Sequence, residues 1–170
     1  MEKYDIAVLG AGIAGLSAAM WTARYGLKTV VIDRMGAGGQ IVTASRIDNQ
    51  TGLPQGVSGY DLGPLAFEQA EAAGAEFRID DIESLTPSQA GVSIACGGDA
   101  IEARAVIVAL GSTPRPLGVP GETEFAGRGI SHCASCDAPL YSGKPVVVIG
   151  GGDTALDEAL VLADSCSSVL

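Results

Sequence analysis

The fold of this chain is decided by the stretch Asp5-Ile-Ala-Val-Leu-Gly10-Ala-Gly12-Ile-Ala-Gly15. It joins a short apolar strand over 5–9 to a helical pattern over 13–25, which stops at Gly26. Gly10 permits a tight turn, Gly12 lets backbone amides approach a pyrophosphate, and Gly15 lets helix and strand pack closely. The helix N-terminus adds partial positive charge. The stretch predicts the opening of a Rossmann-like, dinucleotide-binding domain.

The next predicted strand, 29–33, strengthens that interpretation. It ends at Asp33, close to the ~20 residues beyond the glycines at which a carboxylate accepts hydrogen bonds from an adenosine ribose. The alternative is a tight turn with a solvated Asp. Strand, turn, helix and strand-end acid together favour the nucleotide site.

The rest of the first domain predicts an α/β fold with an antiparallel insertion. A helix over 60–73 stops at Gly74 and leads into a strand over 76–79. The fully apolar run 105–110 is typical of a strand buried on both faces of a parallel sheet. Between them, three short strands form an antiparallel β-meander: 82–86, 92–96 and 100–103.

A second glycine turn follows a proline-rich crossover. Three prolines between 111 and 121 exclude a helix there, so we divide the chain into domains at 1–112 and 113–170. The later stretch Val146-Val-Val-Ile-Gly150-Gly-Gly152-Asp-Thr-Ala155 repeats the first turn, with alanine as the third small residue. A helix over 154–163 and the start of a strand at 168–170 complete the pattern. We expect the start of a second Rossmann-like, NAD(P)-binding domain and a chain that is an N-terminal fragment.

Composition narrows the function classes. The 170 residues carry a formal net charge of −10, which argues against nucleic acid as a partner because phosphate binding relies on clustered Lys and Arg. The apolar runs are far shorter than the roughly 20 residues that a membrane span needs. The first strand begins almost at Met1, which leaves no room for a signal peptide. We therefore expect no membrane partner and a cytoplasmic location.

The stretch Cys133-Ala-Ser-Cys136-Asp137 lies between the two glycine turns. A dithiol between two dinucleotide sites implies that electrons pass from one cofactor through another to sulfur. The alternative is half of a zinc site, but a closed site needs four ligands and neither Cys96 nor Cys166 belongs to a second CxxC motif. We therefore expect no metal.

Other polar residues near these motifs have weaker interpretations. His132 either raises the thiolate fraction as a cation or is a loop side chain. Cys96 and Cys166 are expected to behave as small hydrophobic residues. The acidic residues of the second helix are expected on a solvated face: Asp153, Asp157 and Glu158.

From end to end, the chain resembles the N-terminal half of the low-molecular-weight thioredoxin reductases, which are flavoproteins of the pyridine-nucleotide disulfide oxidoreductase class. The motifs that carry the resemblance match in spacing as well as in identity: 10–15, Gly38-Gly39-Gln40, Ile47-Asp48-Asn49, Ala109-Leu-Gly111, Gly127-Arg-Gly129, 133–137 and 150–155.

The resemblance implies FAD in the first domain, NADPH in the second, and a thioredoxin-like protein disulfide as substrate. Cys136 would face the flavin, Cys133 would be the more exposed thiol that attacks the substrate, and Asp137 would move the proton. It also implies a homodimer at full length. The implied cofactor-binding residues are Gly10, Gly12, Gly15, Asp33, Gly38, Gly39, Gln40, Asn49, Ala109 and Gly111 for FAD, and Gly150, Gly152, Asp153 and Thr154 for NADPH.

Two alternatives stay open. One is a related flavoprotein that passes electrons to a peroxiredoxin or a small dithiol, or accepts them from ferredoxin. The other is a truncated, non-catalytic cofactor-binding module that acts only by association.

Overall fold

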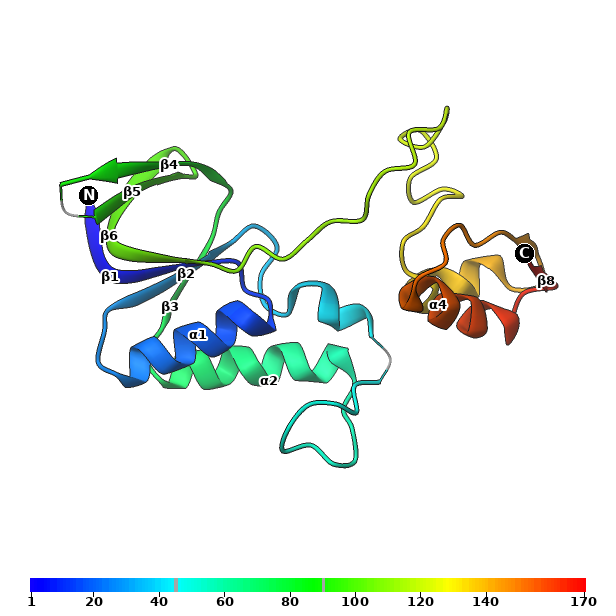
Figure 1. The fold of residues 1–170 in the computed structure, drawn as a ribbon, viewed down its shortest axis with the longest axis horizontal. Helices are drawn as coiled ribbons and strands as arrows, with labels where there is room; N and C mark the ends of the chain where they lie inside the picture. Colours follow the sequence, from blue (N-terminus) through cyan, green and yellow to red (C-terminus); the bar gives the residue numbers. More distant parts are fainter. Residues whose placement is uncertain (45, 90) are drawn as a thin grey trace. The chain divides into compact units, whose positions relative to one another are not determined.

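The structure is a computed structural model that describes residues 1–44, 46–89 and 91–170, the side chains at 88 and 135 excepted. It divides into two compact units, Met1–Ser112 and Thr113–Leu170. Figure 1 shows their elements along the chain.

The first unit is built on a six-stranded mixed sheet with the order β3-β2-β1-β6-β5-β4. The central strands are parallel, and two strands of a meander continue the sheet antiparallel beyond β6. This confirms the predicted α/β, Rossmann-like class with a β-meander insertion. The strands are β1 (Glu2–Leu9), β2 (Thr29–Asp33), β3 (Glu76–Ile79), β4 (Ile82–Ser88), β5 (Gly91–Cys96) and β6 (Asp99–Val108).

Two helices cover one face of the parallel strands, and the meander curls over the other (Figure 1). The helices are α1 (Ile13–Arg24) and α2 (Gly59–Ala72), the second capped by the Ser58 hydroxyl, which accepts from the Asp61 amide. A short 3-10 helix, η1 (Gly39–Thr43), precedes α2. Residues 7–9 of β1 and 29–32 of β2 are therefore buried on both faces, because alternate side chains point to opposite sides of a sheet.

That alternation separates the core into two clusters. Ala7, Leu9 and Ile32 pack with the meander residues Ile94 and Cys96. The side chains at alternate positions, among them Val8 and Val31, pack instead with α1 and α2. All these residues are at most 1% exposed, so the carboxyl ends of β1 and β2 are held rigidly where the first glycine turn begins.

The prediction of two separate strands over 100–103 and 105–110 is wrong, because β6 runs unbroken from Asp99 to Val108. The expected burial on both faces is wrong as well, since Val108 is 65% exposed and Leu110 is 61% exposed. The pairing with β5 ends at Ala103, so beyond that residue β6 pairs with β1 alone among the described residues.

The second unit holds shorter elements. A four-residue helix α3 (Ala134–Asp137) runs into a 3-10 turn, η2 (Ala138–Tyr141). Two short parallel strands, β7 (Pro145–Val146) and β8 (Ser168–Val169), flank helix α4 (Asp153–Ala163). The unit thus contains the glycine turn and the helix that the second motif predicts, whereas its strand is shorter than predicted and ends at Val146.

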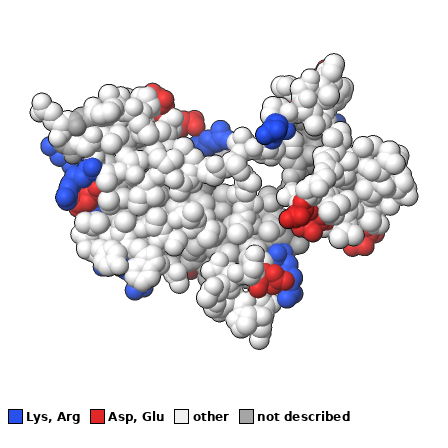
Figure 2. Space-filling model, viewed as in Figure 1, with Lys and Arg blue, Asp and Glu red and all other residues white. Residues whose placement is uncertain are grey.

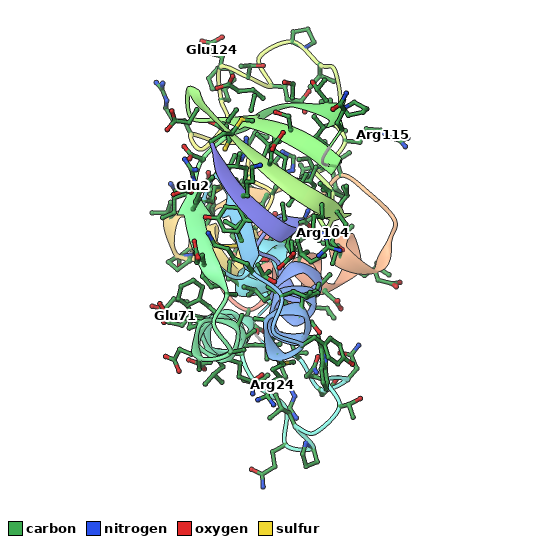
Figure 3. All side chains as sticks on the ribbon, turned by 90° about the vertical axis from the view of Figure 1, so that its left-hand side faces the viewer. Glu2, Arg24, Glu71, Arg104, Arg115 and Glu124 are labelled. Carbon is green, nitrogen blue, oxygen red and sulfur yellow. A yellow bond between two sulfur atoms is a disulfide. The ribbon has the colours of Figure 1, made fainter. Side chains whose placement is uncertain are left out.

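On one face of the molecule, the charged side chains lie in small groups (Figure 2). Figure 2 shows one face, on which Lys and Arg side chains form no broad patch. Arg104, labelled in Figure 3, donates from Nη1 to Asp5 Oδ1 at 2.8 Å and so ties β6 to β1. This hydrogen bond, together with one from the Lys28 amide, lowers the pKa of Asp5. No helix among the described residues is both long enough and apolar enough to cross a membrane.

Candidate functional site

The first glycine turn lies at the carboxyl ends of β1 and β6. Gly10 has φ +103°, and a Cβ built on it would lie 2.3 Å from the Ala109 carbonyl oxygen. A Cβ on Gly15 would lie 1.9 Å from the Gly10 carbonyl oxygen. Only glycine, which has no side chain, allows α1 to pack this closely against the turn. The close approach of Gly10 and Ala109 also brings two separately predicted motifs together.

Gly12 differs from its two neighbours in the motif. It is the N-cap of α1, its φ of −69° is open to any residue, and a Cβ built on it would meet no atom within 4 Å. No side-chain hydrogen bond caps this end of the helix. The open space and the uncapped helix terminus are the features that a bound pyrophosphate requires, so this turn fits the diphosphate of a dinucleotide.

The Asp33 carboxylate at the end of β2 organises the neighbouring loop. Its Oδ2 accepts from the Ala11 amide at 2.8 Å, and its Oδ1 accepts from the Met35 and Gly36 amides at 2.8 and 3.0 Å. A carboxylate has about four acceptor positions, so one position on Oδ2 stays open. This position is available for the predicted ribose contact, while the other three serve a structural role that sequence reasoning missed.

A cavity of about 370 Å³ opens next to Asp33. The residues around it are mostly apolar, and the rings of Phe67 and Phe77 pack against each other, tilted by 47° with 4.3 Å between their centroids. Its size and apolar walls suit a flat heterocycle such as adenine, with the ribose directed toward Asp33. The lining residues are Ala11, Val31, Asp33, Gly36, Ala37, Pro64, Phe67, Phe77, Arg78 and Ile79.

The Gly38-Gly39-Gln40 motif lies against the first turn. The Gly38 amide donates to the Ala11 carbonyl at 2.8 Å, and Gly39 would place a Cβ 3.1 Å from the Gly12 Cα. The Gln40 side-chain amide donates to the Ser112 carbonyl, just after Gly111. These motifs, distant in sequence, thus gather at one edge of the sheet.

Asn49 is exposed in the loop between Ile47 and Val57, which are joined by an isolated antiparallel bridge. No hydrogen bond joins Asn49 to the first glycine turn among the described residues. Its placement near the flavin stays a prediction.

The two cysteines of the CxxC motif form a disulfide at the start of α3, with a Cα–Cα distance of 5.4 Å. Cys133 is the N-cap residue, and its Sγ accepts from the Cys136 amide at 3.2 Å. Cys136 is exposed and Cys133 is half-buried, which reverses the expected order of exposure in this oxidised state. The reason is local, because the capping sulfur of Cys133 is turned back onto the helix.

The residues around the disulfide differ in their contacts. Asp137 is half-buried at the end of α3, and His132 is exposed in the preceding loop. Glu158 of α4 accepts a hydrogen bond from the Ala134 amide at the start of α3. The prediction that Glu158 lies on a solvated face is therefore wrong, whereas Asp153 and Asp157 are exposed as expected. Helical periodicity could not show that the CxxC turn packs against α4.

The remaining cysteines, Cys96 and Cys166, are free thiols. Cys96 is a free thiol in the core of the first unit, and burial raises its pKa. Cys166 is half-buried and its Sγ lies 3.5 Å from the Tyr141 carbonyl oxygen. Within the described residues, no group of three or more His, Cys, Asp or Glu side chains could hold a metal ion.

The second glycine turn precedes α4, whose N-cap is Gly152. As at Gly12, a Cβ built on Gly152 would meet no atom within 4 Å, and no side chain caps the helix. Asp153 and Thr154 are exposed in the first turn. The backbone of this turn fits a phosphate group, although Asp153 adds negative charge beside it.

The family described as pyridine nucleotide-disulphide oxidoreductase matches residues 4–170, and the chain belongs to this family. The two glycine turns and the Cys133–Cys136 disulfide agree with that class. Among curated proteins, the thioredoxin reductase of Treponema pallidum is 42% identical over 160 residues, and that of Bacillus subtilis is 39% identical over 166 residues. These alignments cover 94% and 98% of this chain but 52% of each relative, so the chain spans about half the length of the curated relatives it matches.

A solved structure supports the same family. The thioredoxin reductase of Lactococcus lactis, in its FR conformation, is similar with a TM-score of 0.92 and 35% identity. The alignment covers 98% of this chain and 55% of that one.

Proposed function

We propose that this chain is the N-terminal part of a cytoplasmic, NADPH-dependent thioredoxin reductase that contains FAD. The observation that carries the proposal is the Cys133–Cys136 disulfide in a chain that also holds two glycine turns open to phosphate. The first unit would bind FAD, the second would begin the NADPH domain, and the complete protein would be a homodimer.

The residues at the edge of the first sheet would hold FAD. The α1 amides and Gly12 would face the pyrophosphate, Asp33 the ribose, and the cavity beside Phe67 the adenine. FAD, when bound, supplies a carrier that accepts two electrons from NADPH and passes them on. Gly150 to Thr154 would bind the NADPH phosphates.

The chain's own chemistry takes place at the two sulfurs. Reduction breaks the bond between them and adds two electrons, with up to two protons taken up. The Cys133 thiolate would then attack one sulfur of a thioredoxin-like disulfide and form a mixed disulfide. Attack of Cys136 on Cys133 would release the partner as a dithiol. Asp137 would move the proton that these steps exchange.

The test compares the protein made from the whole gene with its Cys133→Ser/Cys136→Ser variant. We expect the parent to show flavin absorbance that NADPH bleaches and to reduce oxidised thioredoxin, whereas the variant binds flavin but reduces no disulfide. Cys96→Ser is the matched control, because this thiol is free and remote in sequence from the disulfide, and it should keep the activity.

Two results would refute the proposal. Retained activity in the double variant would remove the dithiol from the reaction. A protein without flavin whose cysteines never accept electrons would point to the non-catalytic module. Parallel assays with a peroxiredoxin disulfide and a small disulfide identify the partner.

A further inference from the structure

The CxxC turn is held from outside by one carboxylate. The first amide of α3, that of Ala134, donates to Glu158 Oε2 on α4. Ala134 is only 8% exposed, so this amide needs a partner within the protein. Because α3 has a single turn and cannot be stable alone, the contact with α4 fixes its position.

The other amides of α3 have partners within the turn. The Cys136 amide donates to Cys133 Sγ at 3.2 Å, and the Asp137 amide donates to the Cys133 carbonyl at 3.1 Å. Glu158 and the sulfur of Cys133 therefore share the same helix terminus. The partial positive charge of this helix terminus would stabilise a Cys133 thiolate, but the Glu158 carboxylate lies at the same terminus.

The charged side chains around this turn are few. His132 and Asp137 flank it in sequence, η2 carries no charged residue, and α4 contributes acidic residues alone: Asp153, Asp157 and Glu158. Asp153 and Asp157 are exposed, and only Glu158 of these three makes a hydrogen bond to α3 among the described residues. Glu158 is therefore the acidic residue of α4 that is best placed to act on the sulfurs.

We propose that Glu158 is a positioning residue that fixes the CxxC turn against α4 and whose negative charge disfavours the reduced, thiolate form of the pair. The inference deepens the proposed function and rests on it, since a pair that is harder to reduce is a stronger reductant once reduced. Reduction adds two electrons and breaks the S–S bond. When Cys133 stays a thiolate, one proton is taken up, and the new negative charge is repelled by Glu158.

Two variants separate the hydrogen bond from the charge. Glu158→Gln keeps an oxygen that can accept from the Ala134 amide but removes the charge, whereas Glu158→Ala removes both. Asp157→Asn is the matched control, because it removes the same charge from the adjacent, exposed position on α4.

The measurement is the equilibrium of the 170-residue chain with glutathione buffers, in which two glutathione thiols are oxidised as the Cys133–Cys136 bond is reduced. For Glu158→Gln we expect the equilibrium constant for reduction to rise about 3- to 10-fold, as removal of one nearby, half-exposed charge predicts. The reduced variant should also react faster with iodoacetamide at neutral pH. Asp157→Asn should change both quantities less than about twofold.

Hydrogen exchange tests the positioning role. The Ala134 amide should exchange much faster in Glu158→Ala than in the parent, and close to the parental rate in Glu158→Gln. If Glu158→Ala does not fold, the glutathione equilibrium of Glu158→Gln, compared with that of Asp157→Asn, still tests the proposal. Equal effects of Glu158→Gln and Asp157→Asn would overturn the proposal, as would unchanged exchange at Ala134 in a folded alanine variant.

These readouts use neither flavin nor NADPH. If the double-serine experiment contradicts the proposed function, the thiol equilibrium still reports whether Glu158 acts on the pair. If the Glu158 variants leave the thiol equilibrium unchanged, the double-serine experiment still tests whether the disulfide is the redox centre.

Discussion

The two glycine turns share one sequence pattern but differ in how tightly the protein surrounds them. At the first, Gly15 lies against the Gly10 carbonyl, and the ends of the strands beside it are buried, with Val8, Leu9 and Ile32 at 0% exposed. At the second, Ala155 occupies the third position, and α4 has no buried residue. The apolar residues between β7 and the turn are exposed, with Val147 at 65% and Ile149 at 67%. A glycine motif therefore specifies the turn, while its neighbours decide how much stability depends on it.

The largest expected effect comes from filling the tight turn. Gly15→Ala places a Cβ 1.9 Å from backbone, which side-chain movement cannot relieve, so we expect a loss of about 3 kcal/mol in the free energy of unfolding. Urea unfolding followed by the fluorescence of Trp21 measures it, because this single tryptophan lies in α1 of the first unit. The reverse change in the second unit, Ala155→Gly, should cost at most about 1 kcal/mol. Equal losses in the free energy of unfolding for Gly15→Ala and Ala155→Gly would contradict the difference in packing between the two turns.

A medium effect is expected at the open glycines, where stability and binding should separate. Gly12→Ala meets no protein atom, so the free energy of unfolding should change by less than about 1 kcal/mol. The new methyl group would occupy the approach of the pyrophosphate, and we expect FAD affinity to fall about tenfold or more. Titration of FAD into parent and variant measures the affinity, and Gly152→Ala tests NADPH in the same way. An unchanged FAD affinity would exclude Gly12 from the cofactor site.

The smallest expected effect is on pH dependence. Hydrogen bonds from Arg104 and from the Lys28 amide lower the pKa of Asp5, and those from the Leu117 and Gly118 amides lower that of Glu122. A carboxyl with a lowered pKa in the folded state stabilises that state above its unfolded pKa, and the contribution is lost as pH falls through the folded pKa.

Each unit should therefore lose a little stability below about pH 4. Asp5→Asn should flatten the dependence in the first unit, as followed by Trp21 fluorescence, and leave the second unchanged. Carboxyl titration by NMR gives the two pKa values directly. Values for Asp5 and Glu122 at or above the ordinary range would contradict this interpretation.

The parts of the fold that sequence could predict are those fixed by local rules. The limits of α1 and β2 follow from the glycine turn, Gly26 and the strand-end Asp33. The continuity of β6 could not be predicted, because its pairing with β5 ends at Ala103 while the strand itself continues along β1. The α3 turn and its contact with Glu158 were missed for a related reason, since they depend on packing between segments about 20 residues apart. The role of Asp33 in holding the loop amides is likewise a tertiary detail.

The unbroken course of β6 has a mechanical consequence. Its first half pairs with β5 of the meander and also with residues 2–4 of β1. Its second half pairs with the rest of β1. The meander therefore cannot separate from the parallel strands unless the backbone hydrogen bonds of β6 break. The meander and the parallel strands should therefore unfold together in one cooperative step. The insertion is part of the cooperative unit of the first domain and does not open independently.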